Sequence, residues 1–456
     1  MAITSEDKIL EDLKKAILKG LGRTFERYHF DVEKVLTPMK WKPLVLIVGN
    51  YSSGKSTFIN ELIERDIQRT GQAPTDDSFT ILSYAGPDEE EEIIPGSTVV
   101  NDPTLPFEHL RSYGQSLISH LWLKKVKSDV LKDFAIIDTP GMLDSVTEKD
   151  RGYDYLGVIG EFSRLADCIV LMFDPHKAGT IKETYEAIRS TLPGATGEDR
   201  IIYCLNRIDE CDNIQDLVRS YGALCWNLSQ MTGRKDMPRI YLTYSSSHAV
   251  QKDIDVTSWD NERDELISTI KTAPRMRLSH ILQDADRAIR ELGIVTEFMK
   301  NFKASFWEKV MPTIKVGILS SILAFFVGDV LSNLLIGFPD TPFLTSLLQG
   351  HMDLSNFIFP IVNAVLVITL FTLYLQRLLF PRHIRRAIEE PEGFIDLDTT
   401  FKKDLWKKAK TKVVELVKLQ APRLIWMRHE KAFSRVNKFL EQDLQRMFEL
   451  IGPPSR

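Results

Sequence analysis

The 456-residue sequence predicts an α/β domain with a mainly parallel sheet and helices on both of its faces, followed by a helical region that holds an apolar hairpin. Two observations predict this arrangement. In the first half of the chain, short apolar runs rich in β-branched residues alternate with helix-forming segments, as in a parallel sheet covered on both faces. In the second half lie two apolar runs that are long enough to cross a bilayer.

The length suits two or three domains, and changes in composition along the chain place their boundaries. The predicted segments are an N-terminal helical segment at residues 1–30, the α/β domain at 31–260, the first part of a helical stalk at 261–312, a transmembrane or membrane-inserted hairpin at 313–380 and the second part of the stalk at 381–456.

Charge and cysteine content exclude several classes. The formal net charge of −5 calls for no nucleic-acid partner. Cys168, Cys204, Cys211 and Cys225 show no C-x-x-C spacing, so they predict packed, reduced thiols and no zinc or disulfide framework. The first 30 residues carry mixed charge without the apolar core of a secretory signal.

The first element with chemistry is the run Gly-Asn-Tyr-Ser-Ser-Gly-Lys-Ser at 49–56, which has the P-loop pattern G-x-x-x-x-G-K-[ST]. An apolar strand at 43–48 precedes it, and a helix-forming run at 57–64 follows it. In this context backbone N–H groups cradle the β-phosphate, Lys55 reaches the β and γ oxygens, and Ser56 ligates Mg²⁺. The predicted nucleotide contacts are Gly49, Asn50, Tyr51, Ser52, Ser53, Gly54, Lys55, Ser56 and Thr57.

Two more motifs stand at strand ends, with a further apolar strand at 168–174 between them. The run 134–141 ends in Asp-Thr-Pro-Gly, so Asp138 can hold Mg²⁺ through water and the Gly141 N–H can meet a γ-phosphate. The strand at 200–205 leads into Asn206-Arg207-Ile-Asp209, an N-[KR]-x-D pattern whose carboxylate accepts hydrogen bonds from a purine base. The three motifs follow one another in the order of a GTPase-type P-loop domain.

The hairpin rests on two apolar runs. Leu354–Gln376 holds 23 residues without a charge, enough for a hydrocarbon core of about 30 Å. Val316–Phe338 contains Asp329, and an ionised Asp at mid-bilayer costs about 3 kcal/mol. Three alternatives follow: the first span is short, Asp329 faces its partner helix, or the pair is re-entrant.

The flanking charges predict the orientation. Residues 339–353 hold two Asp and no Lys or Arg, whereas both outer flanks are basic. By the positive-inside rule the protein is a two-span membrane protein with both termini in the cytoplasm. The flanking basic residues are Lys300, Lys303, Lys309, Lys315, Arg377, Arg382, Arg385 and Arg386.

Three helical segments complete the pattern. Apolar residues recur at 3–4 spacing from 261 to 307, with Pro274 separating two helices. The lysine-rich helix at 401–419 either packs its apolar face on neighbouring helices or lies on anionic lipid. The helix at 214–228 presents Trp226 opposite its apolar stripe, as a lone exposed Trp, as one covered by this chain, or as a dimer anchor. The stripe is Ile214, Leu217, Val218, Tyr221, Cys225 and Leu228.

Several segments also resemble a known family. They are the runs at 49–57, 74–79, 95–100, 138–142, 151–154, 173–177 and 221–226. Together they are similar to the G domain of the EHD (EH-domain-containing) ATPases, which belong to the dynamin superfamily. The similarity runs from about residue 20 to 307; no EH domain follows, and the hairpin is more reminiscent of mitofusins and other membrane-anchored dynamin relatives.

The resemblance implies an NTPase that dimerises through the segment containing Trp226, oligomerises on membranes and remodels them. It implies that Ser52 stabilises charge between the β and γ phosphates and places Thr75 in switch I, as the candidate to substitute for a missing Mg²⁺-contacting Thr. One departure stands out: Asp76 replaces the second Thr of the family's Pro-Thr-Thr-Asp-Ser-Phe, a residue that contacts Mg²⁺ and the attacking water.

These observations favour a membrane-anchored, dynamin-like GTPase that uses Mg²⁺ and forms homodimers and larger homo-oligomers on the lipid bilayer. The catalytic candidates are Ser52, Lys55, Thr75 and Asp76. GTP is favoured because the residue after Asp209 is Glu210, unlike the EHD pattern. The alternatives are an EHD-like ATPase and a non-hydrolysing, nucleotide-dependent membrane scaffold.

Overall fold

The computed structural model describes residues 5–69, 78–141, 152–177, 185–186, 199–232, 237–245, 257–337, 339, 342–350 and 354–451. The chain divides into two compact units. The sheet unit comprises Met1–Lys15, Asp31–Arg287 and Arg446–Arg456, and the helical unit comprises Ala16–Phe30 and Ala288–Gln445. The five segments predicted from the sequence stay a prediction.

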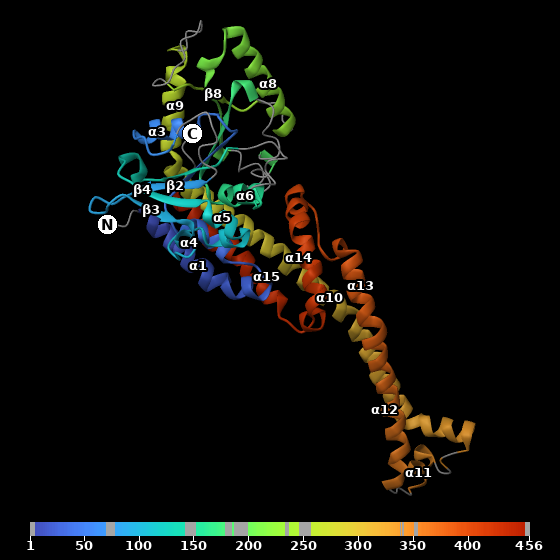
Figure 1. Cartoon of the computed structure of the whole chain (residues 1–456). Helices are drawn as coiled ribbons and strands as arrows, with labels where there is room; N and C mark the ends of the chain where they lie inside the picture. Colours follow the sequence, from blue (N-terminus) through green and yellow to red (C-terminus); the bar gives the residue numbers. More distant parts are fainter. Residues whose placement is uncertain are drawn as a thin grey trace. The chain divides into compact units, whose positions relative to one another are not determined.

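The sheet unit is built on a mixed sheet with the strand order β3-β4-β2-β5-β1-β6-β7-β8 among the described residues (Figure 1). Its strands are β1 Leu44–Gly49, β2 Phe79–Tyr84, β3 Glu92–Pro95, β4 Leu121–Val126, β5 Ala135–Asp138, β6 Cys168–Phe173, β7 Ile201–Leu205 and β8 Ile240–Leu242. The pairs β2–β5 and β3–β4 are antiparallel and the other pairs are parallel. The predicted mainly parallel sheet is therefore confirmed.

Helices cover both faces of the sheet because its central strands are apolar on both sides. Along β1, Leu46 belongs to the core that packs on α6 (Tyr155–Leu165) and α8 (Ile214–Thr232). The next residue, Ile47, belongs to the core that packs on α3 (Lys55–Ile63) and α9 (Asp260–Lys271). Figure 1 shows these two pairs of helices on opposite sides of the sheet.

Short helices complete this unit: α2 Glu33–Leu36, α4 Gly96–Val99 and α5 Gln115–Ser119, with α16 (Gln445–Ile451) near the end of the chain. Pro274 lies in the first turn of α10 (Ala273–Ile336), directly after α9 ends, as predicted. Three of the four cysteines are buried, and burial raises the pKa of the Cys168 thiol to about 12, so it packs as an apolar side chain.

The helical unit contains the second part of α1 (Ser5–Arg27) and most of α10. Its other helices are α11 Phe343–Gln349, α12 Ile358–Tyr374, α13 Phe380–Glu389, α14 Thr400–Leu424 and α15 His429–Lys438. Its core is aromatic: the Phe298 ring stacks on Trp406 with centroids 5.8 Å apart, and Phe302 contacts His383 at 4.7 Å. The apolar residues predicted on α14 are buried: Leu405, Trp406, Val413, Leu416 and Val417. This confirms the interpretation that α14 packs on its neighbours and leaves no apolar face of these residues for lipid.

The apolar hairpin consists of the second half of α10 together with the whole of α12. These two helices pack on each other through small residues. A Cβ added at Gly317 would meet the Phe371 ring at 3.0 Å, and one at Gly328 would meet the Asn363 amide at 3.0 Å. Between them, the Ser321 hydroxyl donates to the Ala364 carbonyl at 3.2 Å. Small residues allow this close approach of two helices, as in membrane-embedded pairs.

Asp329 is fully buried within the hairpin. Its carboxylate accepts the backbone N–H of Val330 at 2.8 Å and that of Phe343, the first residue of α11. Of the three alternatives drawn from the sequence, the one in which Asp329 faces its partner helix is closest to the structure. The partner differs, however, because the carboxylate caps the short helix α11 and does not bond to α12.

Candidate functional site

The P-loop lies where β1 ends and α3 begins. Ser52 and Gly54 have φ angles of 67° and 84°, which turn the chain back over the end of the strand. A Cβ on Gly54 would come within 2.4 Å of the Asn206 side-chain nitrogen, so only glycine fits beside the second motif. The Lys55 ammonium donates to the carbonyls of Gly49 and Asn50, both at 3.0 Å, which holds it over the loop.

The metal-binding candidates meet at the same edge. Asp138 ends β5, which is the strand next to β1, and Ser56 lies in the first turn of α3. The Ser56 hydroxyl donates to Asp138 Oδ2 at 3.2 Å. A hydroxyl and a carboxylate are the hard oxygen ligands that suit Mg²⁺ completed by phosphate oxygens. The residues present therefore fit a nucleotide-bound Mg²⁺.

Gly141 also lies against the loop, since a Cβ there would come within 2.6 Å of Tyr51 Cα. The end of the Asp-Thr-Pro-Gly run therefore adjoins the P-loop, as predicted. Thr75 and Asp76, the switch I candidates, lie outside the described residues. Their roles in metal binding and catalysis stay predictions.

The third motif, Asn206-Arg207-Ile-Asp209, is hydrogen-bonded to the P-loop. The Asn206 amide donates to the Ser53 carbonyl at 2.9 Å and accepts from the Thr243 hydroxyl at 2.9 Å. The Arg207 guanidinium, whose residue has a φ of 63°, donates to the Ser52 carbonyl. Asn206 and Arg207 therefore hold the two loops together. Asp209, the predicted base-recognition residue, is buried, and its role stays a prediction.

Arg207 is itself held by acidic side chains. Its guanidinium pairs with Glu210 and lies 3.6 Å from Asp174. Glu210, which distinguishes this chain from the EHD pattern, is therefore engaged in orienting Arg207. Its bearing on the choice of nucleotide stays a prediction.

Sequence reasoning missed one residue of this site. Gln68 lies beyond the end of α3, is only 7% exposed, and donates from Nε2 to Asp138 Oδ2 at 2.7 Å. No motif contains it. The available signal was Asn60, a polar residue in the apolar run of α3, which fixes the backbone of Gln68.

The exposed face of α8 is larger than predicted. Trp226 is 68% exposed, as expected from its place opposite the apolar stripe. The stripe itself was wrong in part, because Ile214 (51%), Val218 (62%) and Tyr221 (37%) are exposed. Among the residues of α8 whose burial is described, Leu217, Leu224 and Leu228 are the buried ones. Apolar residues occupy both faces of the helix, so periodicity alone placed the centre of the buried face too close to Val218.

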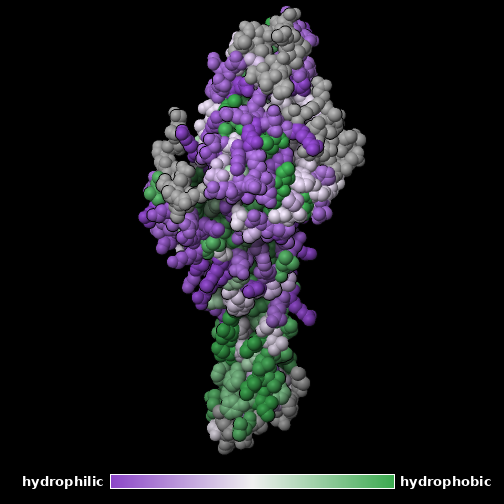
Figure 2. All heavy atoms as spheres, turned by 60° about the vertical axis from the view of Figure 1, so that its left-hand side comes forward, coloured by the Kyte–Doolittle hydropathy of each residue, from purple (hydrophilic) through white to green (hydrophobic). Residues whose placement is uncertain are grey.

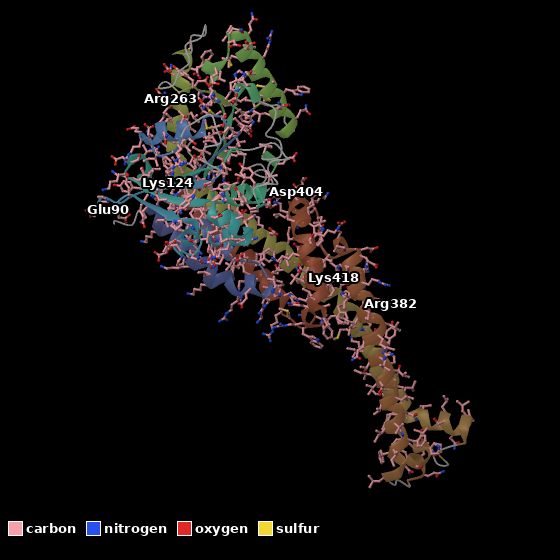
Figure 3. All side chains as sticks on the ribbon, in the orientation of Figure 1. Glu90, Lys124, Arg263, Arg382, Asp404 and Lys418 are labelled. Carbon is pink, nitrogen blue, oxygen red and sulfur yellow. The ribbon has the colours of Figure 1, made fainter. Side chains whose placement is uncertain are left out.

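The hairpin presents a second apolar surface. Within the described part of the chain, two helices are long and apolar enough to cross a membrane, and only 17% and 6% of their most apolar windows are buried. A core helix of a soluble protein would be mostly buried. Figure 2 shows apolar residues gathered over the hairpin. Arg382, labelled in Figure 3, lies on α13 just after the apolar run ends.

Comparisons with known proteins agree with this site. Residues 45–202 match the Dynamin family. EH domain-containing protein 1 of Homo sapiens is 33% identical over 276 residues, which cover 60% of this chain and 49% of that protein. EH domain-containing protein 3 of Rattus norvegicus is 32% identical with the same coverage, 60% and 49%. The chain thus spans about half the length of the curated relatives it matches.

Among solved structures, one of an oligomerised bacterial dynamin pair covers 98% of this chain and 74% of its own, at 12% identity and a TM-score of 0.36. At this TM-score the likeness says nothing further about the chain. The family match covers the P-loop, Asp138 and the strands of the sheet from β1 to β6. The chain is therefore similar to dynamin-family proteins over residues 45–202 and to EH domain-containing proteins over 60% of its length.

Proposed function

We propose that the protein is a membrane-anchored, Mg²⁺-dependent nucleotide hydrolase, with GTP as the favoured substrate, which assembles through its G domain and remodels the bilayer that it enters. The observation that carries this proposal is the joining of three motifs at one edge of the sheet. Ser56 bonds to Asp138, and Asn206 bonds to the P-loop. The carboxyl ends of parallel strands are where such folds bind ligands.

In this proposal each residue of the site has one task. Lys55 leaves the loop carbonyls that it now contacts and meets the β and γ phosphate oxygens. Ser56 and Asp138 hold Mg²⁺, which when bound neutralises charge on the phosphates. Ser52 stabilises charge between the β and γ phosphates, and the N–H of Gly141 meets the γ-phosphate. Thr75 completes the metal ligands and helps to position the attacking water.

Asp209 supports GTP because a carboxylate accepts both N–H groups of the guanine edge. It is buried next to Arg207, which is fastened to the P-loop. The relatives named for an EH domain keep ATP as the second candidate, because the EHD family that the chain resembles uses ATP with a similar motif. Turnover of both nucleotides under the same conditions decides between them.

Asp76 supports the scaffold alternative, in which binding alone controls assembly. It would place a negative charge beside the γ-phosphate where the resembled family has a neutral hydroxyl. Asp76→Thr restores that hydroxyl, so turnover should rise. A fall of tenfold or more, about 1.4 kcal/mol of barrier, would mean that Asp76 is itself a working group.

The exposed apolar face of α8 supports a two-fold dimer. Trp226 and Val218 are exposed in the single chain and lie about 80° apart around the helix. Exposed aromatic residues of this kind are enriched at the centres of protein interfaces. A two-fold axis through α8 would bury the same face of both copies.

The hairpin supports insertion into the bilayer with both termini in the cytoplasm. Leu348 on α11 is 81% exposed, which suits a thiol probe at the tip. In a Cys225→Ser background, Leu348→Cys should react with an impermeant thiol reagent only from the outside of intact cells. Labelling only from the cytosolic side would mean that the hairpin is re-entrant.

The test of the whole proposal is nucleotide hydrolysis by the purified full chain, with and without liposomes, using GTP and ATP side by side. We expect Mg²⁺-dependent turnover that is faster on liposomes and faster with GTP. Lys55→Ala is the matched inactive control. Binding of nucleotide without turnover in either condition would favour the scaffold, and absence of binding would refute the site.

A further inference from the structure

Gln68 connects the metal-binding edge of the site to β4, two strands away from β5 in the sheet. Its amide nitrogen donates to Asp138 Oδ2 at 2.7 Å, and its amide oxygen accepts from the Lys124 ammonium at 2.7 Å. Lys124, labelled in Figure 3, lies on β4, and β2 separates β4 from β5 in the sheet. Gln68 thus bridges a cation and a carboxylate that lie on different strands.

The orientation of the Gln68 amide is determined by these two partners. An ammonium group can only donate, so the amide oxygen must face Lys124. The amide nitrogen then faces Asp138, and one of its N–H groups donates to Oδ2. Lys124 therefore fixes which end of the amide meets the carboxylate.

The backbone of Gln68 is fixed as firmly as its side chain. The Asn60 amide donates to the Gln68 carbonyl at 2.8 Å, and its oxygen accepts the Gln68 N–H at 2.8 Å. Asn60 follows Ser56 by four residues on α3, so both side chains lie on one face of that helix. The helix that carries the hydroxyl ligand thus also positions the residue that holds the carboxylate ligand.

Asp138 Oδ2 is the point where these contacts meet, since it accepts from both Ser56 and Gln68. All the groups involved are buried or half-buried. In metal sites, groups that hydrogen-bond to a ligand fix its direction, and their loss commonly weakens metal binding about 10- to 100-fold.

We propose that Gln68 is a positioning residue for Mg²⁺: it holds the Asp138 carboxylate toward Ser56, so that the Mg²⁺–nucleotide complex meets two aligned oxygen ligands. This inference rests on the proposed function, because it assumes that a nucleotide with Mg²⁺ binds at the P-loop. It predicts that Gln68 acts on the metal-dependent part of nucleotide affinity and not on the part supplied by Lys55 and the loop backbone.

The test measures the affinity of the full-length protein for a fluorescent GTP analogue across a Mg²⁺ titration and in EDTA. Gln68→Leu should raise the Mg²⁺ concentration for half-maximal binding about 10- to 100-fold. The affinity in EDTA should stay within about twofold of the parent. Gln115→Leu, an exposed position at the start of α5, is the control and should change neither quantity.

A second variant keeps the test decisive if Gln68→Leu does not fold. Lys124→Met leaves Gln68 in place but removes the cation that orients its amide, so the Mg²⁺ midpoint should rise in the same direction by a smaller factor. Equal losses of affinity with Mg²⁺ and in EDTA would show that Gln68 only anchors the loop, and an unchanged midpoint would overturn the inference directly. If the parent protein itself binds no analogue, the proposed function fails, which is a different result from either of these.

Discussion

Two buried aspartates, one in each unit, show how the same side chain serves different ends. Asp138 at the end of β5 accepts hydrogen bonds from two side chains, those of Ser56 and Gln68. Asp329 inside the hairpin accepts from two backbone N–H groups, those of Val330 and Phe343. Burial therefore does not separate a functional carboxylate from a structural one.

The partners do separate them. Side-chain donors can turn away when a ligand arrives, so Asp138 can exchange a partner for a metal-bound water. Backbone donors are fixed by the helix that contains them, so Asp329 closes the tip of the hairpin by capping α11. A buried Asp that caps a helix start in this way also keeps its polar side chain away from lipid. The comparison thus predicts that changes at Asp138 weaken nucleotide binding, whereas changes at Asp329 loosen the tip of the hairpin.

The largest expected effect lies at the nucleotide site, beside Asp138. Lys55→Ala removes the cation that meets the β and γ phosphates, so affinity for labelled GTP and ATP should fall about a hundredfold or more, given 1.5–3 kcal/mol for each charged hydrogen bond. Equilibrium binding with the purified protein measures this. Parent-like binding of both nucleotides would mean that the P-loop is not the site.

Exchanging each aspartate for asparagine tests the comparison itself. Asp138→Asn should weaken Mg²⁺-dependent nucleotide binding about 10- to 100-fold, since the amide is a poor metal ligand and a poor acceptor for metal-bound water. Asp329→Asn should leave nucleotide binding unchanged. Instead, amide exchange in Phe343–Gln349 should become roughly five- to tenfold faster in detergent, because a neutral acceptor holds the helix start less tightly.

The result that would break the comparison is a shared one. If Asp329→Asn lowered nucleotide affinity as much as Asp138→Asn does, the two carboxylates would not have separate roles. Measuring both variants by nucleotide titration and by hydrogen exchange distinguishes these cases.

The same two residues show what could be predicted from the sequence. Asp138, the P-loop and Asn206 were predictable because each stands in a short motif with fixed spacing at the end of an apolar strand. The contacts of Gln68 were not, because its partners Lys124 and Asp138 lie 56 and 70 residues away and meet only when β4, β2 and β5 form one sheet. The partner of Asp329 was likewise hidden, since it is a backbone group 14 residues on in a separate short helix.

The α8 helix shows a different limit. Its residues were correctly assigned to a helix, and Trp226 was correctly placed outside. The buried face was misplaced because Ile214 and Val218 fit the 3.6-residue period as well as Leu224 does. Only packing on the sheet chooses between two apolar faces, and a face left exposed is itself a sign of a partner.

A smaller effect is expected at this exposed face of α8. It extends the comparison to exposed tryptophans, one in each unit. Trp226→Glu should raise the dissociation constant of the dimer about 30-fold, as expected for loss of an interface residue worth about 2 kcal/mol. Nucleotide binding by the monomer and association with liposomes should stay unchanged. Light scattering in detergent across a range of protein concentrations measures the change.

Trp426 provides the matched control, because it is 73% exposed but lies in the helical unit, stacked edge-on against Trp307 at 5.3 Å. Trp426→Glu makes the same chemical change and should leave the dimer intact. An unchanged dimer for Trp226→Glu would remove α8 from the interface, and equal losses for both variants would point to a general effect of the charge.

The smallest expected effect concerns His429, a buried histidine of the helical unit. His429 is fully buried; Nε2 contacts the Leu424 carbonyl at 2.7 Å, and Nδ1 contacts the Tyr28 hydroxyl at 2.6 Å. A carbonyl can only accept, so Nε2 carries the proton and Nδ1 accepts from Tyr28.

Burial lowers the pKa of His429 below its ordinary value of 6.5, and the bond to the Leu424 carbonyl opposes this only in part. The unfolded chain then binds the proton more readily than the folded one, so the contribution of His429 to stability is complete above about pH 6.5 and is lost as the pH falls toward the folded pKa. Hydrogen exchange in α15 and in the part of α1 that contacts it should therefore quicken between pH 7.5 and 5.5, after correction for the intrinsic pH dependence of exchange. His429→Asn should remove most of this pH dependence while lowering protection at every pH, and an unchanged slope in that variant would assign the effect to another group.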